Sequence, residues 1–437
     1  MMILTVVGIL LLLVLLITWA KFHPFIAFLI VSIVAALLLK LPPDQIGKAI
    51  QKGVGDILGP VFTVIILGAM LGKMIASSGA AQRISEALVG LFGQKNLAWA
   101  LTLTGFIVGI PLFYNVGFIL LVPLIYSLGQ RYNMPLVYMA CALCSALSVT
   151  HGFLPPHPAP TAIVPLMHAD IGKTLIFGLI AAIPVILISG PLFALTVKNI
   201  KAQPLASLKV KIFENNEMPS TTACFMAALM PVVLLAFGTW FTNIFDKSSL
   251  AYKLSSLISD ANIVMIMSLL FAYYILGIHR GAKLSELMKE GIEASKDVFP
   301  IIMIIAGAGA LKEILTSAGI STYIGELVKT SSFSPLIMGW FIAAVIRLSL
   351  GSATVAGLTA AGLIAPGIDP SVVNPNLMVL AIGAGSLMFS HVNDTGFWMF
   401  KEYFNLSIKD TIKSWSLMET VVSFTGLIVV WILHYFV

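Results

Sequence analysis

The sequence Ser390-His-Val-Asn-Asp-Thr-Gly396 lies inside the otherwise apolar stretch 376–400. A second polar sequence, Thr150-His-Gly-Phe-Leu-Pro-Pro-His-Pro-Ala-Pro-Thr161, interrupts the apolar stretch 136–167 in the same way. Proline and glycine end or bend helices, and short polar side chains compete with the backbone for hydrogen bonds. Each apolar stretch is therefore predicted to be a helix that breaks near its middle.

The composition of the remaining chain is that of an integral membrane protein. The 437 residues are 59% hydrophobic and only 10% charged, whereas soluble domains contain about 25% charged residues. This excludes a soluble enzyme and a nucleic-acid-binding protein. The net charge of +6 needs no acidic partner, because lysine and arginine concentrate in the cytoplasmic loops of membrane proteins.

Ten apolar stretches are long enough to be membrane spans, since a span takes about 20 residues. Two further stretches, 97–128 and 335–365, contain glycine, proline and polar residues at their middles and are predicted to be hairpins. Whether these hairpins are re-entrant or fully spanning is left open. The excess of lysine and arginine on one side places both termini outside. The predicted spans are 2–20, 24–40, 57–77, 136–167, 175–197, 222–242, 261–277, 298–318, 376–400 and 416–436.

The two halves of the chain repeat each other at an offset of 240 residues over about 110 positions, as in Pro60 and Pro300, or His151 and His391. Each half contains five spans and one hairpin. An odd number of spans inverts the second copy, and inverted repeats are typical of secondary transporters with a mid-membrane substrate site. The predicted organisation is a first repeat (1–200), a cytoplasmic linker (201–221) and a second, inverted repeat (222–437).

The candidate substrate site lies where the hairpin tips meet the helix breaks, since irregular chain in hydrocarbon is tolerated where it lines a cavity. Helix N-termini at such breaks favour an anion, and hydroxyl and amide side chains suit a polyol. The predicted substrate-binding residues are Tyr114, Asn115, Gly117, His151, Pro156, His157, Arg347, Gly351, Ser352, Thr354, Ser390, His391, Asn393 and Thr395.

Five of the charged or titratable residues carry specific predictions. An arginine at bilayer depth is costly, so Arg347 is expected to bind a substrate carboxylate, with a structural ion pair as the alternative. Asp394 is the predicted site of the coupling ion or proton, although an aspartate there would also cap the next helix. His151 and His391 are predicted proton carriers, with structural hydrogen bonds as the alternative. Glu313 is expected at the membrane interface.

Three sequences carry a family resemblance: His151-Gly-Phe-Leu-Pro-Pro-His-Pro, Gly351-Ser-Ala-Thr-Val-Ala preceded by Arg347, and Ser390-His-Val-Asn-Asp-Thr-Gly-Phe-Trp. They resemble the gluconate permease family of the bacterial inner membrane, within the ion-transporter superfamily. The resemblance implies proton-coupled symport of gluconate or a related small hydroxy acid, without a cofactor. It also implies a homodimer in lipid, with an elevator-type mobile part, residues 97–170 and 335–410, and a scaffold.

The chain departs from the family pattern at Asn115, where many members have an acidic residue. This keeps open a carrier of the same fold for D-serine or another small organic acid, coupled to H⁺ or Na⁺. Two hypotheses from other classes are an intramembrane metalloenzyme, with His151, His157 and His391 as ligands, and a passive channel. No metal site is expected, because the general base of metal-dependent hydrolases is missing from the sequence.

Overall fold

The computed structural model describes residues 2–202, 213–242, 244–319, 333–365, 368–370, 372–392 and 394–437, and this part of the chain is helical throughout, without strands. The helices of the first half are α1 (Met2–Thr18), α2 (Pro24–Leu38), α3 (Pro43–Ser77), α4 (Ala80–Phe92), α5 (Leu97–Gly109), α6 (Tyr114–Tyr132), α7 (Leu136–Phe153), α8 (Pro158–Leu166), α9 (Ile171–Leu187) and α10 (Phe193–Val197). Those of the second half are α11 (Thr221–Thr242), α12 (Leu250–Leu257), α13 (Ala261–Ala272), α14 (Leu284–Ser317), α16 (Pro335–Leu350), α17 (Ala353–Ile364), α18 (Pro375–Ser386), α19 (Thr395–Tyr403), α20 (Ile408–Thr411) and α21 (Leu417–Leu433).

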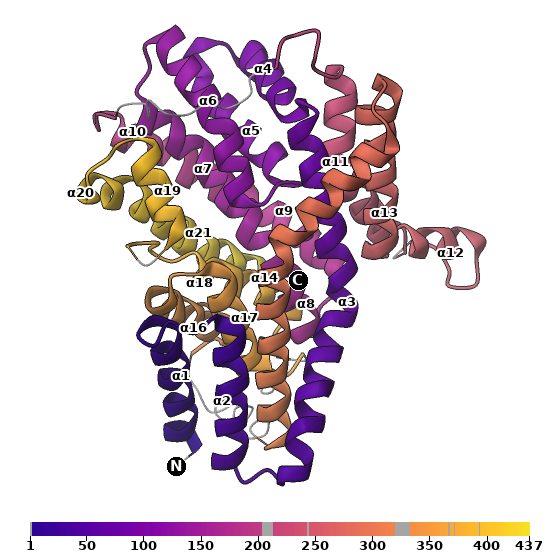
Figure 1. Ribbon diagram of the computed structural model, residues 1–437, viewed down its shortest axis with the longest axis vertical. Helices are drawn as coiled ribbons and strands as arrows, with labels where there is room; N and C mark the ends of the chain where they lie inside the picture. The colour runs from indigo at the N-terminus through magenta and orange to yellow at the C-terminus, as the bar shows by residue number, and fades with distance from the viewer. Residues whose placement is uncertain are drawn as a thin grey trace.

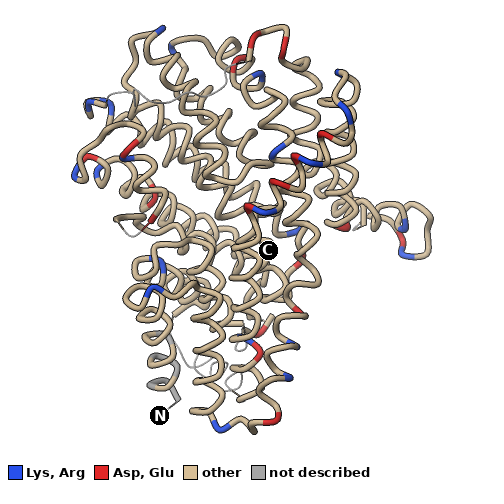
Figure 2. The backbone as a smooth tube through the Cα atoms, viewed as in Figure 1, with Lys and Arg blue, Asp and Glu red and all other residues tan. Residues whose placement is uncertain are grey.

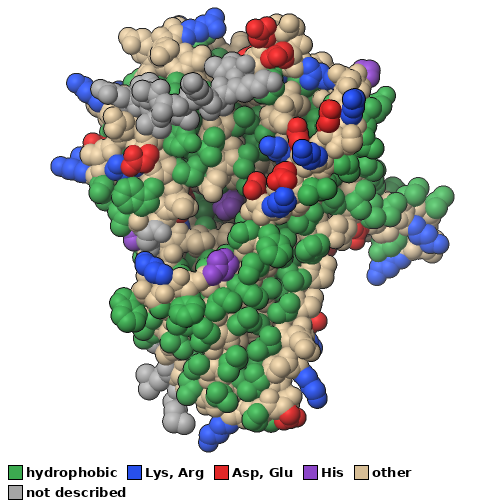
Figure 3. All heavy atoms as spheres, viewed as in Figure 1, with side chains coloured by type: hydrophobic (Ala, Val, Ile, Leu, Met, Phe, Trp, Pro, Cys, Tyr) green, Lys and Arg blue, Asp and Glu red, His purple; other side chains and the backbone are tan. Residues whose placement is uncertain are grey.

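Among the described residues, seven helical segments are long and apolar enough to cross a membrane. Large hydrophobic side chains stay exposed on many of them, and apolar surface covers much of the lower half of the molecule in Figure 3. Such surface is stable against lipid. The chain is therefore a multi-pass membrane protein. The seven segments are Pro43–Ser77, Leu136–Leu166, Ile171–Val197, Thr221–Thr242, Ala261–Arg280, Leu284–Ser317 and Ile408–Leu433.

Both predicted helix breaks are present. The stretch 136–167 forms α7 and α8, with residues 154–157 between them, and the stretch 376–400 forms α18 and part of α19, with 387–394 between them. The break before α8 follows from four prolines, Pro155, Pro156, Pro158 and Pro160. Pro158 sits in the first turn of the new helix, where a missing N–H costs nothing. The first break is buried inside the bundle, whereas the second is buried at Leu387 and Ser390 and exposed at Val392.

The two predicted hairpins are helix pairs with short turns. The first consists of α5 and α6, and the second of α16 and α17. Gly351 ends α16 with a φ of +76°, a left-handed conformation that side chains with a Cβ rarely adopt. With 12 residues, α17 is about 18 Å long, shorter than the roughly 30 Å hydrocarbon core of a bilayer.

The long helices α3 and α14 cross at the centre of the bundle and are flanked by their neighbours in a matching way (Figure 1). Helix α2 packs on α14 just as α13 packs on α3, and α5 packs on α7 just as α16 packs on α18. Charged side chains are frequent near the two ends of the molecule and on the first half of α14 (Figure 2). These helix contacts are thus alike in the two halves of the chain.

The crossing of α3 and α14 depends on Gly53 and Gly309, whose backbones touch. A Cβ built on either glycine would clash with the carbonyl oxygen of the other. We expect Gly53→Ala to lower the unfolding midpoint in detergent, since forcing atoms into a packed interface costs about 1–3 kcal/mol. Gly55→Ala is the matched control, because its Cβ would meet nothing within 4 Å. Equal midpoints in the two variants would contradict this tight crossing.

The sequence predicts Glu313 at the membrane interface, and the structure buries it in the contact between α3 and α14. Glu313 is only 6% exposed, and its carboxylate pairs with the ammonium of Lys52 on α3 at 2.9 Å. Lys52 also pairs with Asp56 at 3.0 Å. The cause is the close α3–α14 crossing, which brings a carboxylate and a lysine from distant parts of the sequence together.

Candidate functional site

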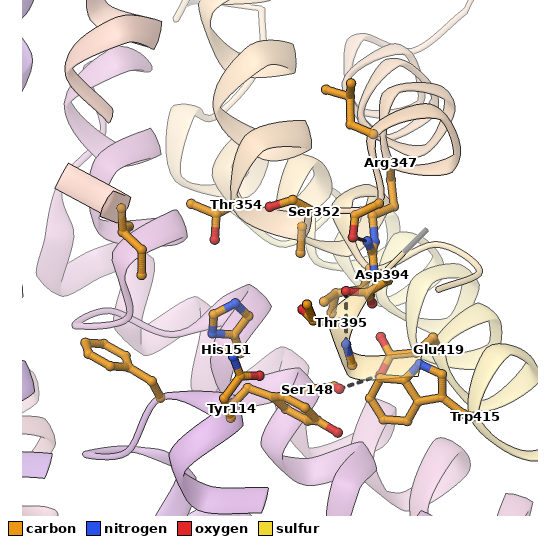
Figure 4. A pocket seen from close by; sticks show the side chains of 18 of the residues that line it. Tyr114, Ser148, His151, Arg347, Ser352, Thr354, Asp394, Thr395, Trp415 and Glu419 are labelled. Carbon is orange, nitrogen blue, oxygen red and sulfur yellow. Dashed lines mark hydrogen bonds and ion pairs between the residues drawn. The ribbon is translucent and has the colours of Figure 1, made fainter. Parts of the chain in front are cut away.

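A cavity of about 350 Å³ lies where the first hairpin tip, the second hairpin tip and the second helix break meet (Figure 4). Its volume is within the range of about 300–1,000 Å³ that is typical of small-molecule sites. Both halves of the chain contribute to its wall. The lining residues are Phe113, Tyr114, Asn115, Ser148, His151, Ile301, Ile304, Arg347, Leu350, Gly351, Ser352, Ala353, Thr354, Leu387, Asp394, Thr395, Gly396, Trp415 and Glu419.

Three helices begin at this cavity. The first residues of α6, α17 and α19 are Tyr114, Ala353 and Thr395, and all of them line it. Ser352 caps α17 by accepting a bond from the N–H of Val355 at 3.3 Å. A helix N-terminus carries about half a positive charge and exposes free N–H groups. The backbone thus makes the cavity favourable for an anion.

Arg347 is the cationic side chain of the cavity wall, and it is 3% exposed. One terminal nitrogen pairs with the carboxylate of Asp394 at 2.5 Å, and the other donates to the carbonyl of Gly351. The Nε–H is buried without a hydrogen-bond partner. An unsatisfied buried donor costs about 1–3 kcal/mol, so Arg347 has capacity to bind one more acceptor.

Asp394 is held by more than Arg347. Its carboxylate accepts a hydrogen bond from the hydroxyl of Ser390 and caps α19 through the N–H of Gly396 at 3.2 Å. The hydroxyl of Ser390 in turn accepts from the indole N–H of Trp415 at 2.7 Å. Both structural alternatives named from the sequence are present: Arg347 forms an ion pair, and Asp394 caps the next helix.

The three histidines of the breaks have different surroundings. His151 lines the cavity, and its buried Nδ1 has no partner. His157 lies behind it, with ring centroids 5.5 Å apart and Nε2 at 2.7 Å from the carbonyl oxygen of Gly109. His391 is more exposed, with Nε2 at 3.0 Å from the carbonyl oxygen of Leu348. The described part of the chain contains no group of three or more metal-ligating side chains.

The structure brings nine of the predicted site residues together at the cavity: Tyr114, Asn115, His151, Arg347, Gly351, Ser352, Thr354, Asp394 and Thr395. Five others do not line it. Gly117 packs against Leu147 of α7, Pro156 and His157 line a separate void of about 10 Å³, Ser390 supports Asp394, and His391 faces the surface. Asn393 lies outside the described residues.

Sequence reasoning missed Glu419, Ser148 and Trp415. Glu419 of α21 is 1% exposed, and its carboxylate accepts a hydrogen bond from the hydroxyl of Ser148. The missed signal is the presence of a carboxylate inside the predicted span 416–436, because an ionisable residue within a span usually has a function. Trp415 and Ser148 carry no comparable signal.

The chain is similar to known permeases over nearly its whole length. The family model described as GntP family permease matches residues 1–436. The chain is 42% identical to the high-affinity gluconate transporter of Escherichia coli K12, covering 98% of each chain, and 42% identical to the gluconate permease of Bacillus licheniformis, covering 95% of each. The Gnt-II system L-idonate transporter of Escherichia coli K12 is 39% identical, with 96% of each chain covered.

Two solved structures share the fold. The YdaH transporter of Alcanivorax borkumensis matches with a TM-score of 0.67 over 94% of this chain and 98% of its own, and MtrF of Neisseria gonorrhoeae with 0.68 over 94% of each. Both are 13% identical to the chain, so this likeness concerns the fold alone. The match of the family model over residues 1–436 settles the identity: the chain belongs to the GntP family of permeases.

Proposed function

We propose that the protein is a secondary active transporter that takes up gluconate, or a closely related sugar acid, together with protons. The observation that carries the proposal is the buried Arg347, with an unused donor, in a cavity where three helix N-termini meet. These groups recognise a carboxylate. The gluconate and L-idonate transporters among the relatives support a substrate with one carboxylate and several hydroxyls.

In this proposal the carboxylate of the substrate binds at Arg347 and the N-terminus of α17. The hydroxyl groups of the sugar-acid chain bind polar side chains on the other walls, since each of these can donate or accept a hydrogen bond. Figure 4 shows Ser352 and Thr354 facing His151 across the cavity. The residues proposed for the hydroxyl groups are Asn115, His151, Ser352, Thr354 and Thr395.

Asp394 takes the role of holding Arg347 in place. It has a guanidinium partner, a helix cap and a serine hydroxyl, and these contacts fix the position of its carboxylate. The ion pair also balances the charge of Arg347 when the cavity is empty. The proton-carrier role that the sequence predicts for Asp394 stays a prediction, as does that of His391.

For the transport cycle we propose two inverted repeats and an elevator movement in a homodimer. The matching contacts of α3 and α14 support the repeat, and the short α17 supports re-entrant hairpins. The mobile part would consist of residues 97–170 and 335–410. Ile301 and Ile304 of α14 then form the scaffold wall of the cavity. Both termini are proposed to lie on the outer, periplasmic side of the bacterial inner membrane.

The test is uptake of labelled gluconate into proteoliposomes under an imposed inward proton gradient. We expect accumulation that a protonophore abolishes. Accumulation that is unaffected by the protonophore but requires a Na⁺ gradient would contradict proton coupling. If the proteoliposomes take up D-serine but not gluconate, the substrate is an amino acid and not a sugar acid. Downhill equilibration without accumulation would favour the channel hypothesis.

A further inference from the structure

A second carboxylate, that of Glu419, faces the cavity and takes no part in the Arg347–Asp394 ion pair. Glu419 lies near the start of α21, and Figure 4 shows its carboxyl group beside Ser148 and Trp415. The residue is 1% exposed. The carboxylate of Glu419 accepts a hydrogen bond from the hydroxyl of Ser148. Glu419 forms no ion pair within the described part of the chain.

These surroundings do not support a permanently charged glutamate. A carboxylate has about four lone-pair sites, of which Ser148 fills one. An ionised carboxylate that is buried without a partner costs several kcal/mol. The group is therefore stable when it binds a proton, and it lines the cavity that also contains Arg347.

The titratable and charged groups near Glu419 come from four packed elements. Arg347 of α16 is the cation among them, and its charge is committed to Asp394 at the start of α19. Tyr114 of α6 and Cys144 of α7 are the neutral titratable neighbours, and His151 of α7 lines the same cavity. None of these supplies Glu419 with a counter-charge of its own.

We infer that Glu419 carries the coupling proton. This inference rests on the proposed function. An ionised Glu419 repels a substrate carboxylate in the same cavity, whereas the protonated acid does not. One proton from outside therefore binds to the carboxylate of Glu419, and the substrate anion then binds at Arg347. On the inner side Glu419 releases its proton, and the ionised carboxylate then repels the substrate anion, which leaves the cavity.

Glu419→Gln keeps the shape of the side chain and imitates the protonated acid. We expect this variant to bind gluconate and to exchange labelled for unlabelled gluconate across proteoliposomes. Accumulation driven by the proton gradient should fall by about tenfold or more, the equivalent of at least about 1.4 kcal/mol. Exchange should also become independent of pH. The matched control is Glu293→Gln, which removes an exposed carboxylate on α14.

The outcomes separate this inference from the proposed function. If the natural protein does not accumulate gluconate, the proposed function fails. If the natural protein and Glu419→Gln accumulate it equally, the inference fails and the proposed function stands. If Glu419→Gln does not fold, Ser148→Ala decides, since it removes the hydrogen bond to the carboxylate and leaves the acid in place. A shifted pH dependence of uptake supports the inference, and an unchanged one overturns it.

Discussion

Arg347→Ala is expected to abolish binding of gluconate while the protein still folds. The substitution removes the cation of the cavity wall and the donors that a substrate carboxylate needs. It also leaves Asp394 facing the cavity without its counter-charge, which repels an anion. A hydrogen bond to a charged group contributes about 1.5–3 kcal/mol, so losing the one offered by the free Nε–H weakens binding by about tenfold or more, and the repulsion by Asp394 weakens it further.

Titration calorimetry with gluconate on the purified variant measures this effect. Arg347→Lys is an informative second variant, because it keeps the charge but loses the planar fork that binds two oxygens. Its affinity should lie between those of the natural protein and Arg347→Ala. Arg131→Ala is the matched control, because Arg131 is exposed at the end of α6, next to Tyr132. If Arg347→Ala binds gluconate with unchanged affinity, Arg347 does not bind the substrate carboxylate.

Asp394→Asn is expected to destabilise the empty protein without preventing gluconate binding. The guanidinium of Arg347 is 3% exposed and loses its ion partner. Removing one member of a buried pair costs about 3–5 kcal/mol, which lowers the unfolding midpoint by many degrees. A bound substrate carboxylate then replaces the missing charge, so affinity for gluconate should be equal or higher.

Added gluconate should therefore raise the unfolding midpoint of Asp394→Asn more than that of the natural protein, since a ligand that binds only the folded state stabilises it. Asp260→Asn is the control, because Asp260 caps α13 and forms no ion pair within the described residues. Accumulation in Asp394→Asn should still follow the proton gradient. If it does not, Asp394 is the proton carrier that the sequence predicted.

The sequence was sufficient for the breaks and hairpins because the residues that cause them are local. Prolines around Pro158, the glycine at Gly351 and the polar run that ends at Asp394 act on the backbone at their own positions. The same local reasoning placed Arg347 at a hairpin tip. These features brought nine predicted residues to one cavity.

The sequence was not sufficient where packing between distant helices decides. Glu419 reaches the cavity because α21 packs beside α7, and the residue 240 positions earlier, Leu179, is apolar, so a comparison of the two halves does not draw attention to it. The burial of Glu313 and its ion pair were not predicted for a related reason, since the close packing of α3 and α14 at Gly53 and Gly309 brings Lys52 to it. The start of α3 at Pro43, well before the predicted 57, reflects an amphipathic first part that a search for apolar runs does not detect.

The three helix starts at the cavity have an evolutionary consequence. Their N–H groups belong to the main chain, so a substitution there leaves them in place unless it introduces proline. A preference for negatively charged cargo is thus inherited with the architecture. The choice among such cargoes depends on a few replaceable side chains, such as Asn115 and Thr354. New specificities can therefore arise in this lineage by small steps, without rebuilding the site.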